Sequence, residues 1–95
     1  GQILHAGTPG EGDLTREAAL ELAYQALMEE FGLTREQLEA GQVTSSDFHT
    51  RDEGNPLWGF SIFVDNQGVD MDCGIMLDAR TGEILLTNVI TGANG

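Results

Sequence analysis

The segment Asp78-Ala79-Arg80-Thr81-Gly82-Glu83 constrains the fold of this chain more than any other feature. It joins two runs of β-forming residues, Val69 to Leu77 and Ile84 to Ile90, and its four central residues make a loop of a length that closes a β-hairpin. Gly82 can adopt a positive φ without steric cost, and Asp78 can accept hydrogen bonds from backbone N–H groups of the loop. The segment therefore predicts an antiparallel pair in which its first and last residues face each other.

A second turn, Asp65-Asn66-Gln67-Gly68, predicts another hairpin in which Val64 lies opposite Val69. Side chains alternate between the two faces of a strand, so each turn also assigns the faces. The first turn predicts the pairs Leu77–Ile84, Ile75–Leu86, Cys73–Asn88 and Met71–Ile90, and the second predicts Ile62–Met71, Phe60–Cys73 and Trp58–Ile75. Both turns thus place one continuous apolar face on the same side of the sheet, and their agreement supports the register.

Two helices are predicted before the strands. Thr15 is a suitable N-cap for a helix from Arg16 to about Phe31, and Gly32 is well placed to end it. The segment Thr34-Arg35-Glu36-Gln37 is a capping-box pattern that opens a short second helix, which Gly41 ends. The first helix has an apolar stripe at helical spacing, made of Ala19, Leu22, Ala23, Ala26 and Leu27.

After Gly41 the hydrophobic period changes to two. The first strand, Gln42 to Arg51, is polar, which is typical of an edge strand. The second, Leu57 to Val64, alternates apolar residues and precedes the two hairpin strands described above. The predicted fold class is therefore α+β, with one long N-terminal helix and a short second helix packed on one face of a four-stranded antiparallel meander.

Ninety-five residues, of which 40% are hydrophobic, are enough for a single domain with its own core. Residues 1–12 contain four glycines and one proline, so we expect a flexible leader there. The domain is expected to cover residues 13–91, followed by a flexible tail at 92–95.

The net charge of −12, with only four basic residues, argues against nucleic acid as a partner because little could neutralise its phosphates. An anionic membrane surface is disfavoured for the same reason, and no apolar run approaches the ~18 residues that a membrane span needs. Cys73 is the only cysteine, so no internal disulfide can form. Solubility, a basic partner or a cation-rich environment each fit this charge.

No catalytic constellation is evident. Cys73 and His49 could in principle act as nucleophile and base, but the predicted register turns Cys73 into the core. Two dispersed histidines and one cysteine make no zinc site, and no cofactor is expected. Asp65, Asp70, Asp72 and Asp78 together resemble a calcium site, but Gly74 stands where an EF-hand loop that starts at Asp70 needs its third ligand. We therefore interpret Asp70 and Asp72 as solvated carboxylates on the outer face of the sheet. Trp58 is interpreted as core because it alternates with other apolar residues.

The outer face of the predicted sheet is the best candidate for a binding surface. The register places Leu57, Met76 and Leu85 in one cross-strand row, and Gly59, Gly74 and Thr87 in the next. Glycines beside an apolar row allow another chain to approach closely, and an exposed apolar patch can mark a partner site. The alternative is that the glycines let the sheet bend and that neighbouring segments cover the apolar row. The candidate partner-binding residues are Leu57, Gly59, Gly74, Met76 and Leu85.

Two segments give the chain a resemblance to a known family. Leu14-Thr15-Arg16-Glu17-Ala18-Ala19-Leu20-Glu21-Leu22-Ala23 opens the long helix, and Gly74-Ile75-Met76-Leu77-Asp78-Ala79-Arg80-Thr81-Gly82-Glu83-Ile84-Leu85 forms the last hairpin. In this order they resemble a PepSY domain, in which a helix opening with Leu-Thr-x-Glu-x-Ala precedes strands joined by an Asp-Ala-x-Thr-Gly-Glu turn. The second short helix, the long polar strand and the strong acidity depart from that family.

The resemblance implies a non-enzymatic, bacterial, protein-binding module that acts by protein–protein contact outside the cell or at the cell envelope, its export signal or anchor having been removed. PepSY-like segments also occur in propeptides of thermolysin-type peptidases, so a peptidase-inhibitory or prosegment-like regulator is an alternative. A calcium-dependent envelope module that uses Asp70 and Asp72 is another.

Overall fold

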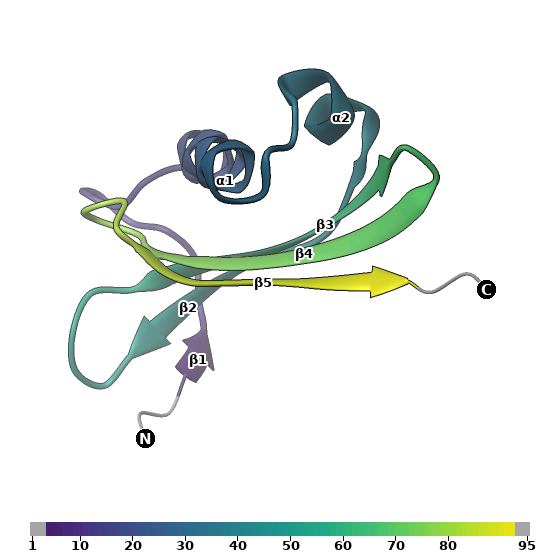
Figure 1. Cartoon of the computed structure of the whole chain (residues 1–95). Coiled ribbons are helices and arrows are strands. Elements are labelled where there is room, and N and C mark those ends of the chain that lie inside the picture. The colour runs from purple at the N-terminus through teal and green to yellow at the C-terminus, as the bar shows by residue number, and fades with distance from the viewer. Residues whose placement is uncertain (1–3, 93–95) are drawn as a thin grey trace.

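The computed structural model describes residues 4–92 and shows two layers, with both helices on one face of an antiparallel sheet (Figure 1). The predicted α+β class is confirmed, but the sheet has five strands in the order β1-β2-β3-β4-β5, so the prediction of four was wrong. The elements are β1 (Leu4–Ala6), α1 (Arg16–Phe31), α2 (Arg35–Ala40), β2 (Gln42–Arg51), β3 (Leu57–Asn66), β4 (Val69–Asp78) and β5 (Ile84–Gly92).

Both helices begin and end where the sequence predicts. The Thr15 hydroxyl accepts a hydrogen bond from the backbone N–H of Ala18, and Gly32 ends α1 in the left-handed conformation with φ 70°. In α2 the Thr34 hydroxyl accepts from the backbone N–H of Gln37, whose side chain accepts in turn from the Thr34 N–H, which completes the capping box. Local sequence therefore determines these boundaries.

The additional strand lies within the segment that we expected to be a flexible leader. β1 pairs antiparallel with the end of β2, with Leu4 opposite Arg51 and Ala6 opposite His49. Two expectations need correction: part of the leader is a strand, and β2 is an open edge only along its N-terminal part. At the other end, Gly92 belongs to β5, and the rest of the predicted tail lies outside the described residues.

The β3–β4 hairpin has the predicted faces but a register shifted by two residues. Its turn consists of Gln67 and Gly68, with φ 55° and 87°, so Asn66 rather than Val64 lies opposite Val69. This geometry matches the two-residue turns with positive φ that suit the twist of a hairpin. The observed inward-facing pairs are Val64–Met71, Ile62–Cys73, Phe60–Ile75 and Trp58–Leu77. A shift of two preserves side-chain direction, so these residues are buried as expected.

The register of β5 differs from the prediction, and this changes which of its side chains face outward. Leu77 lies opposite Ile84 as predicted, but Met76 then lies opposite Leu86, so Leu85 is an extra residue in a β-bulge. Every later pair is displaced by one, and the predictions that place Leu86 and Ile90 on the core face are wrong. Leu86 is 57% exposed and Ile90 65% exposed, whereas Val89 packs against the core.

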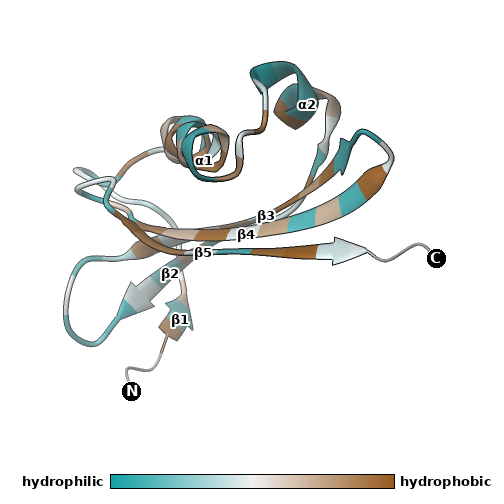
Figure 2. Cartoon of the chain, in the orientation of Figure 1, coloured by the Kyte–Doolittle hydropathy of each residue, from teal (hydrophilic) through white to brown (hydrophobic). Residues whose placement is uncertain are grey.

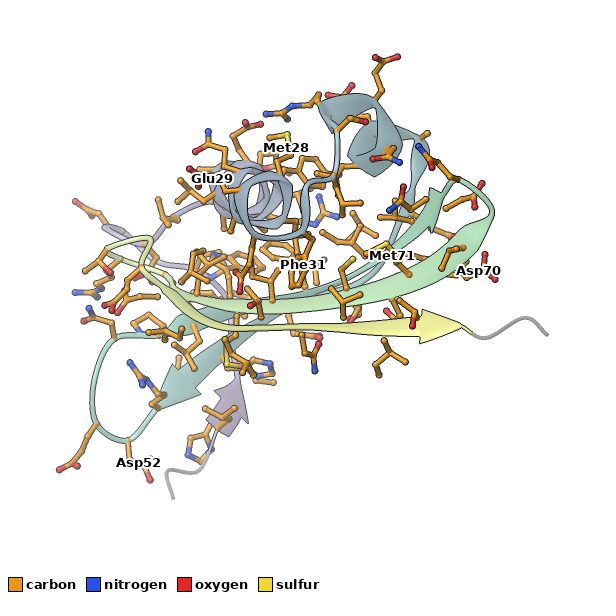
Figure 3. All side chains as sticks on the ribbon, in the orientation of Figure 1. Met28, Glu29, Phe31, Asp52, Asp70 and Met71 are labelled. Carbon is orange, nitrogen blue, oxygen red and sulfur yellow. The ribbon has the colours of Figure 1, made fainter. Side chains whose placement is uncertain are left out.

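The core lies between α1 and the inner face of the sheet. Ala19, Ala23 and Leu27 from the predicted stripe are fully buried, and Phe31 and Met71 lie between helix and sheet in Figure 3. Glu29 lies on the opposite side of the helix (Figure 3). Figure 2 shows the same division in α2, which is brown on the side towards the sheet and teal on the side away from it.

Trp58 is buried in this core, as predicted. Its ring stacks on Phe60 at 5.6 Å between centroids and meets Phe48 edge-on, and its indole N–H donates to the carbonyl of Leu14.

The turn at Asp78 forms as predicted. The N–H of Asp78 donates to the carbonyl of Glu83 at 2.8 Å, and that of Gly82, whose φ is 80°, donates to the carbonyl of Asp78. Arg80 donates to the carboxylate of Asp13, just before α1. The hairpin is therefore attached to the segment that leads into the first helix.

Candidate functional site

The outer face of the sheet, which neither α1 nor α2 covers, carries a shallow hollow of roughly 290 Å³. Strands β2 to β5 all contribute to it, so its shape depends on the register of the whole sheet. The residues that line it are Ser45, Asp47, His49, Gly59, Phe60, Ser61, Gly74, Ile75, Met76, Leu86 and Asn88.

Two glycines form the floor of the hollow. The outer face has one cross-strand row of Asp47, Gly59, Met76 and Leu86, and an adjacent row of Ser45, Ser61, Gly74 and Asn88. Gly59 and Gly74 are therefore diagonal neighbours, which corrects the prediction that they face each other. Each lacks a Cβ, so the backbone of the two central strands is open to an approaching group.

The two glycines differ in how much space lies above them. A Cβ built at Gly59 would have its nearest neighbours at 3.9 Å, in ordinary contact with the Asp47 carbonyl and the end of Met76. A Cβ at Gly74 would lie 2.5 Å from Oδ1 of Asn88, because the Asn88 side chain lies over that position. Space for a bound group is therefore above Gly59, and Asn88 forms a wall of the hollow.

The five predicted partner-binding residues are not all placed alike. Gly59, Gly74 and Met76 line the hollow, and Met76 is half-buried. Leu57 is only 4% exposed, so it offers little surface to a partner, as in the alternative that neighbouring segments cover it. Leu85 is 44% exposed but lies in the bulge. Leu86 instead pairs with Met76 and lines the hollow, at the position that we expected Leu85 to occupy.

Sequence reasoning missed the polar wall of the hollow, which contains Asp47, His49 and Asn88. It also missed Leu86, although one signal was present: Ile84, Leu85 and Leu86 are three consecutive apolar residues, which interrupts strict alternation. A strand that loses alternation next to a turn is a candidate for a bulge.

The electrostatic character of this face is acidic. Asp47 lines the hollow, and Asp72 lies on the same outward row as Phe63 and Ile90. The chain has no lysine, and its four arginines contact other groups: Arg16 binds Ser46, Arg35 binds Glu21, Arg51 binds the carbonyl of Asn55, and Arg80 binds Asp13. No arginine lines the hollow.

The residues considered for catalysis or metal binding lie apart. His49 is on the outer face, whereas Cys73 is fully buried on the inner face, opposite Ile62 and Val89 rather than Phe60 and Asn88. Burial, and then the charge of Asp72, raise the pKa of the Cys73 thiol, which lowers its reactivity at neutral pH. Asp70 lies at the β3–β4 end of the sheet (Figure 3). Within residues 4–92, no group of three or more His, Cys, Asp or Glu side chains is arranged to hold a metal ion.

Comparisons with models of protein families, with curated proteins and with solved structures gave no match. Among the described helices, none has the length and apolar character needed to cross a membrane.

Proposed function

We propose that this chain is a non-catalytic protein-binding module that holds an extended segment of another protein in the hollow on its outer sheet face. The observation that carries the proposal is the open floor at Gly59 within an uncovered sheet face. An open glycine floor allows the backbone of a bound segment to approach the sheet closely.

The chemistry of the surface favours a cationic, apolar segment. Met76 and Leu86 supply apolar contact, while Asp47 supplies a negative charge at the hollow. The net charge of −12 would attract a basic partner over a long range and repel an acidic one. Small polar groups of the wall, such as Ser61 and Asn88, can exchange hydrogen bonds with a bound backbone.

The resemblance to PepSY domains supports the same class of function and adds the expectation of an exported, envelope-associated module. It also makes peptidases the first class of partner to test. A thermolysin-type peptidase that retains full activity with saturating amounts of this chain would argue against peptidase regulation, and would leave the binding surface to be tested separately.

The surface can be tested with two short peptides that share an apolar centre and differ only in flanking lysines or glutamates. Titrated into the ¹⁵N-labelled chain, the lysine peptide should shift the amide signals of Gly59 and Gly74, and the glutamate peptide should not. Gly59→Val should fold, since a β-branched residue suits a strand and its Cβ has space, but should abolish the shifts by filling the hollow.

Thr50→Val is the matched control, because Thr50 is an exposed residue that alternates with His49 and so faces away from the hollow. It should bind like the unmodified chain. Equal shifts with Gly59→Val, shifts confined to another surface, or no shifts with either peptide would each contradict the assignment.

A further inference from the structure

Within residues 4–92, no strand pairs with the outer edge of β5, and this edge lacks the protection that is usual for an exposed strand. β5 is the last strand of the sheet, and its sequence, Ile-Leu-Leu-Thr-Asn-Val-Ile-Thr-Gly, has no charged residue and no proline. Natural proteins normally protect such edges with charges, proline, bulges or very short strands, because unpaired N–H and C=O groups recruit other strands. In Figure 2 this strand is coloured largely as hydrophobic, in agreement with exposed Leu86 and Ile90.

The opposite edge of the sheet is protected in the usual way. The last part of β2 is covered by β1, and the rest carries polar residues, Asp47 and a bulge at Thr44. The bulge of β5 lies beside its hairpin and leaves Leu86–Gly92 in regular pairing with β4. This contrast between the two edges indicates that another strand covers the β5 edge in solution.

We infer that a second copy of this chain covers the β5 edge by antiparallel pairing, β5 to β5, around a two-fold axis at Asn88. This alignment pairs Leu86–Ile90, beyond the bulge, with the same residues of the second copy, and it is self-complementary, as a two-fold interface requires. On the outer face Leu86 lies opposite the partner's Ile90, and on the inner face Thr87 lies opposite the partner's Val89. An alignment centred at Val89 would instead leave Leu86 opposite glycine and Ile90 opposite asparagine.

Charge also favours this edge as the contact between two copies. Each copy carries a net charge of −12, so two copies can approach closely only where carboxylates are few. The nine residues of β5 carry no charge themselves, and the acidic groups beside them lie on other elements: Glu30 accepts a hydrogen bond from Thr87, and Asp70 and Asp72 of β4 pair with Gly92 and Ile90. The sheets of both copies would then be continuous, with the two hollows on the same side. This inference is independent of what the hollow binds.

Each copy contributes at most the nine residues of β5, fewer than the roughly 20–30 residues per side of a standard interface of about 1,600 Å², so we expect a weak dimer with a dissociation constant of ~10 µM to ~1 mM. Sedimentation equilibrium over a range of concentrations should detect it. Raising the salt from about 0.01 to 0.1 M should strengthen association, because the Debye length falls from about 30 to 10 Å and the repulsion between acidic copies is screened.

Ile90→Lys should weaken dimerisation at least roughly tenfold, since it places an ammonium group opposite the partner's Leu86. Its side chain is 65% exposed, so the monomer should remain folded. Val69→Lys is the matched control: it adds the same charge at an exposed residue at the start of β4, next to the β3–β4 turn, and should dimerise normally.

A cysteine introduced by Asn88→Cys should form an intermolecular disulfide under mild oxidation, whereas Ser61→Cys on central strand β3 should not. Native Cys73 is fully buried and does not interfere. A chain that stays monomeric at ~1 mM, a dimer that Ile90→Lys leaves intact, or a dimer in which Asn88→Cys does not crosslink would each overturn the inference.

Discussion

At the scale of single residues, Asp78 connects its own hairpin turn with the loop between β2 and β3. Its Oδ1 accepts hydrogen bonds from the N–H groups of Arg80 and Thr81 at 2.7 and 2.9 Å, and both carboxylate oxygens accept from the Asn55 amide. Burial by itself would raise the pKa of Asp78, but these donors outweigh it and hold the pKa below its ordinary value. The ionised form is therefore part of the native structure.

Asp78→Asn should destabilise the fold by about 1–3 kcal/mol at pH 7, because an amide replaces one acceptor oxygen with a donor that faces the Asn55 amide. The Asp78 contribution should be fully present above the unfolded-state pKa of about 3.9 and be lost as pH falls through the lower folded-state pKa. Urea unfolding between pH 7 and 2 measures both effects. Asp72→Asn, at an exposed carboxylate, is the control, and equal stability of the two variants at pH 7 would contradict this role.

At the scale of elements, the junction between α2 and β2 depends on Gly41. Its φ of −76° suits any residue, so conformational freedom is not the reason for glycine here. A Cβ at this position would overlap the backbone carbonyl oxygen of Phe63 in β3. The absence of a side chain therefore allows α2 to turn directly into the sheet.

Gly41→Ala should lower the free energy of unfolding by about 1–3 kcal/mol, because a backbone oxygen in a paired strand cannot move aside as a side chain can. Gly10→Ala is the control, since the only neighbour of its Cβ is a carboxylate oxygen 3.8 Å away, and it should change stability by less than about 0.5 kcal/mol. Chemical denaturation compares the two. If Gly41→Ala leaves the free energy of unfolding unchanged, the junction between α2 and β2 is looser than the contact with the Phe63 carbonyl indicates.

At the scale of the whole molecule, stability should decrease from the centre of the sheet towards β1. Ile62 and Cys73, which pair across the central strands, are fully buried in the core, whereas all three residues of β1 are exposed. Local opening is easiest where few apolar contacts are lost. The molecule should therefore open first at the β1 edge and last at the β3–β4 pair.

Native-state hydrogen exchange should show this order. The amides of Ile62 and Cys73 should exchange only through global unfolding, and those of β1 should exchange by local opening at a much lower free energy. Amides at the regular part of β5 should become more protected as the protein concentration rises if two copies pair there. Equal protection in β1 and β3 would show that the added strand is an integral part of the folding unit.

The sequence by itself determined features that depend on neighbouring residues. The caps at Thr15 and Thr34, the turn at Asp78 and the inward face of the central strands all follow from local chemistry and a period of two or 3.6 residues. The inward face of the central strands also determined which face of the sheet the helices leave uncovered.

Only the tertiary structure decided the pairing of distant segments. The β1 strand needs the edge of β2, and a leader with exposed residues carries little signal of its own. The Leu85 bulge displaced the later residues of β5 by one, which turned Leu86, Asn88 and Ile90 outward. This displacement completed the β5 side of the hollow and made the outer face of the β5 edge apolar. A one-residue displacement reverses every side chain that follows it, so a face that appears certain from alternation depends on a single backbone irregularity.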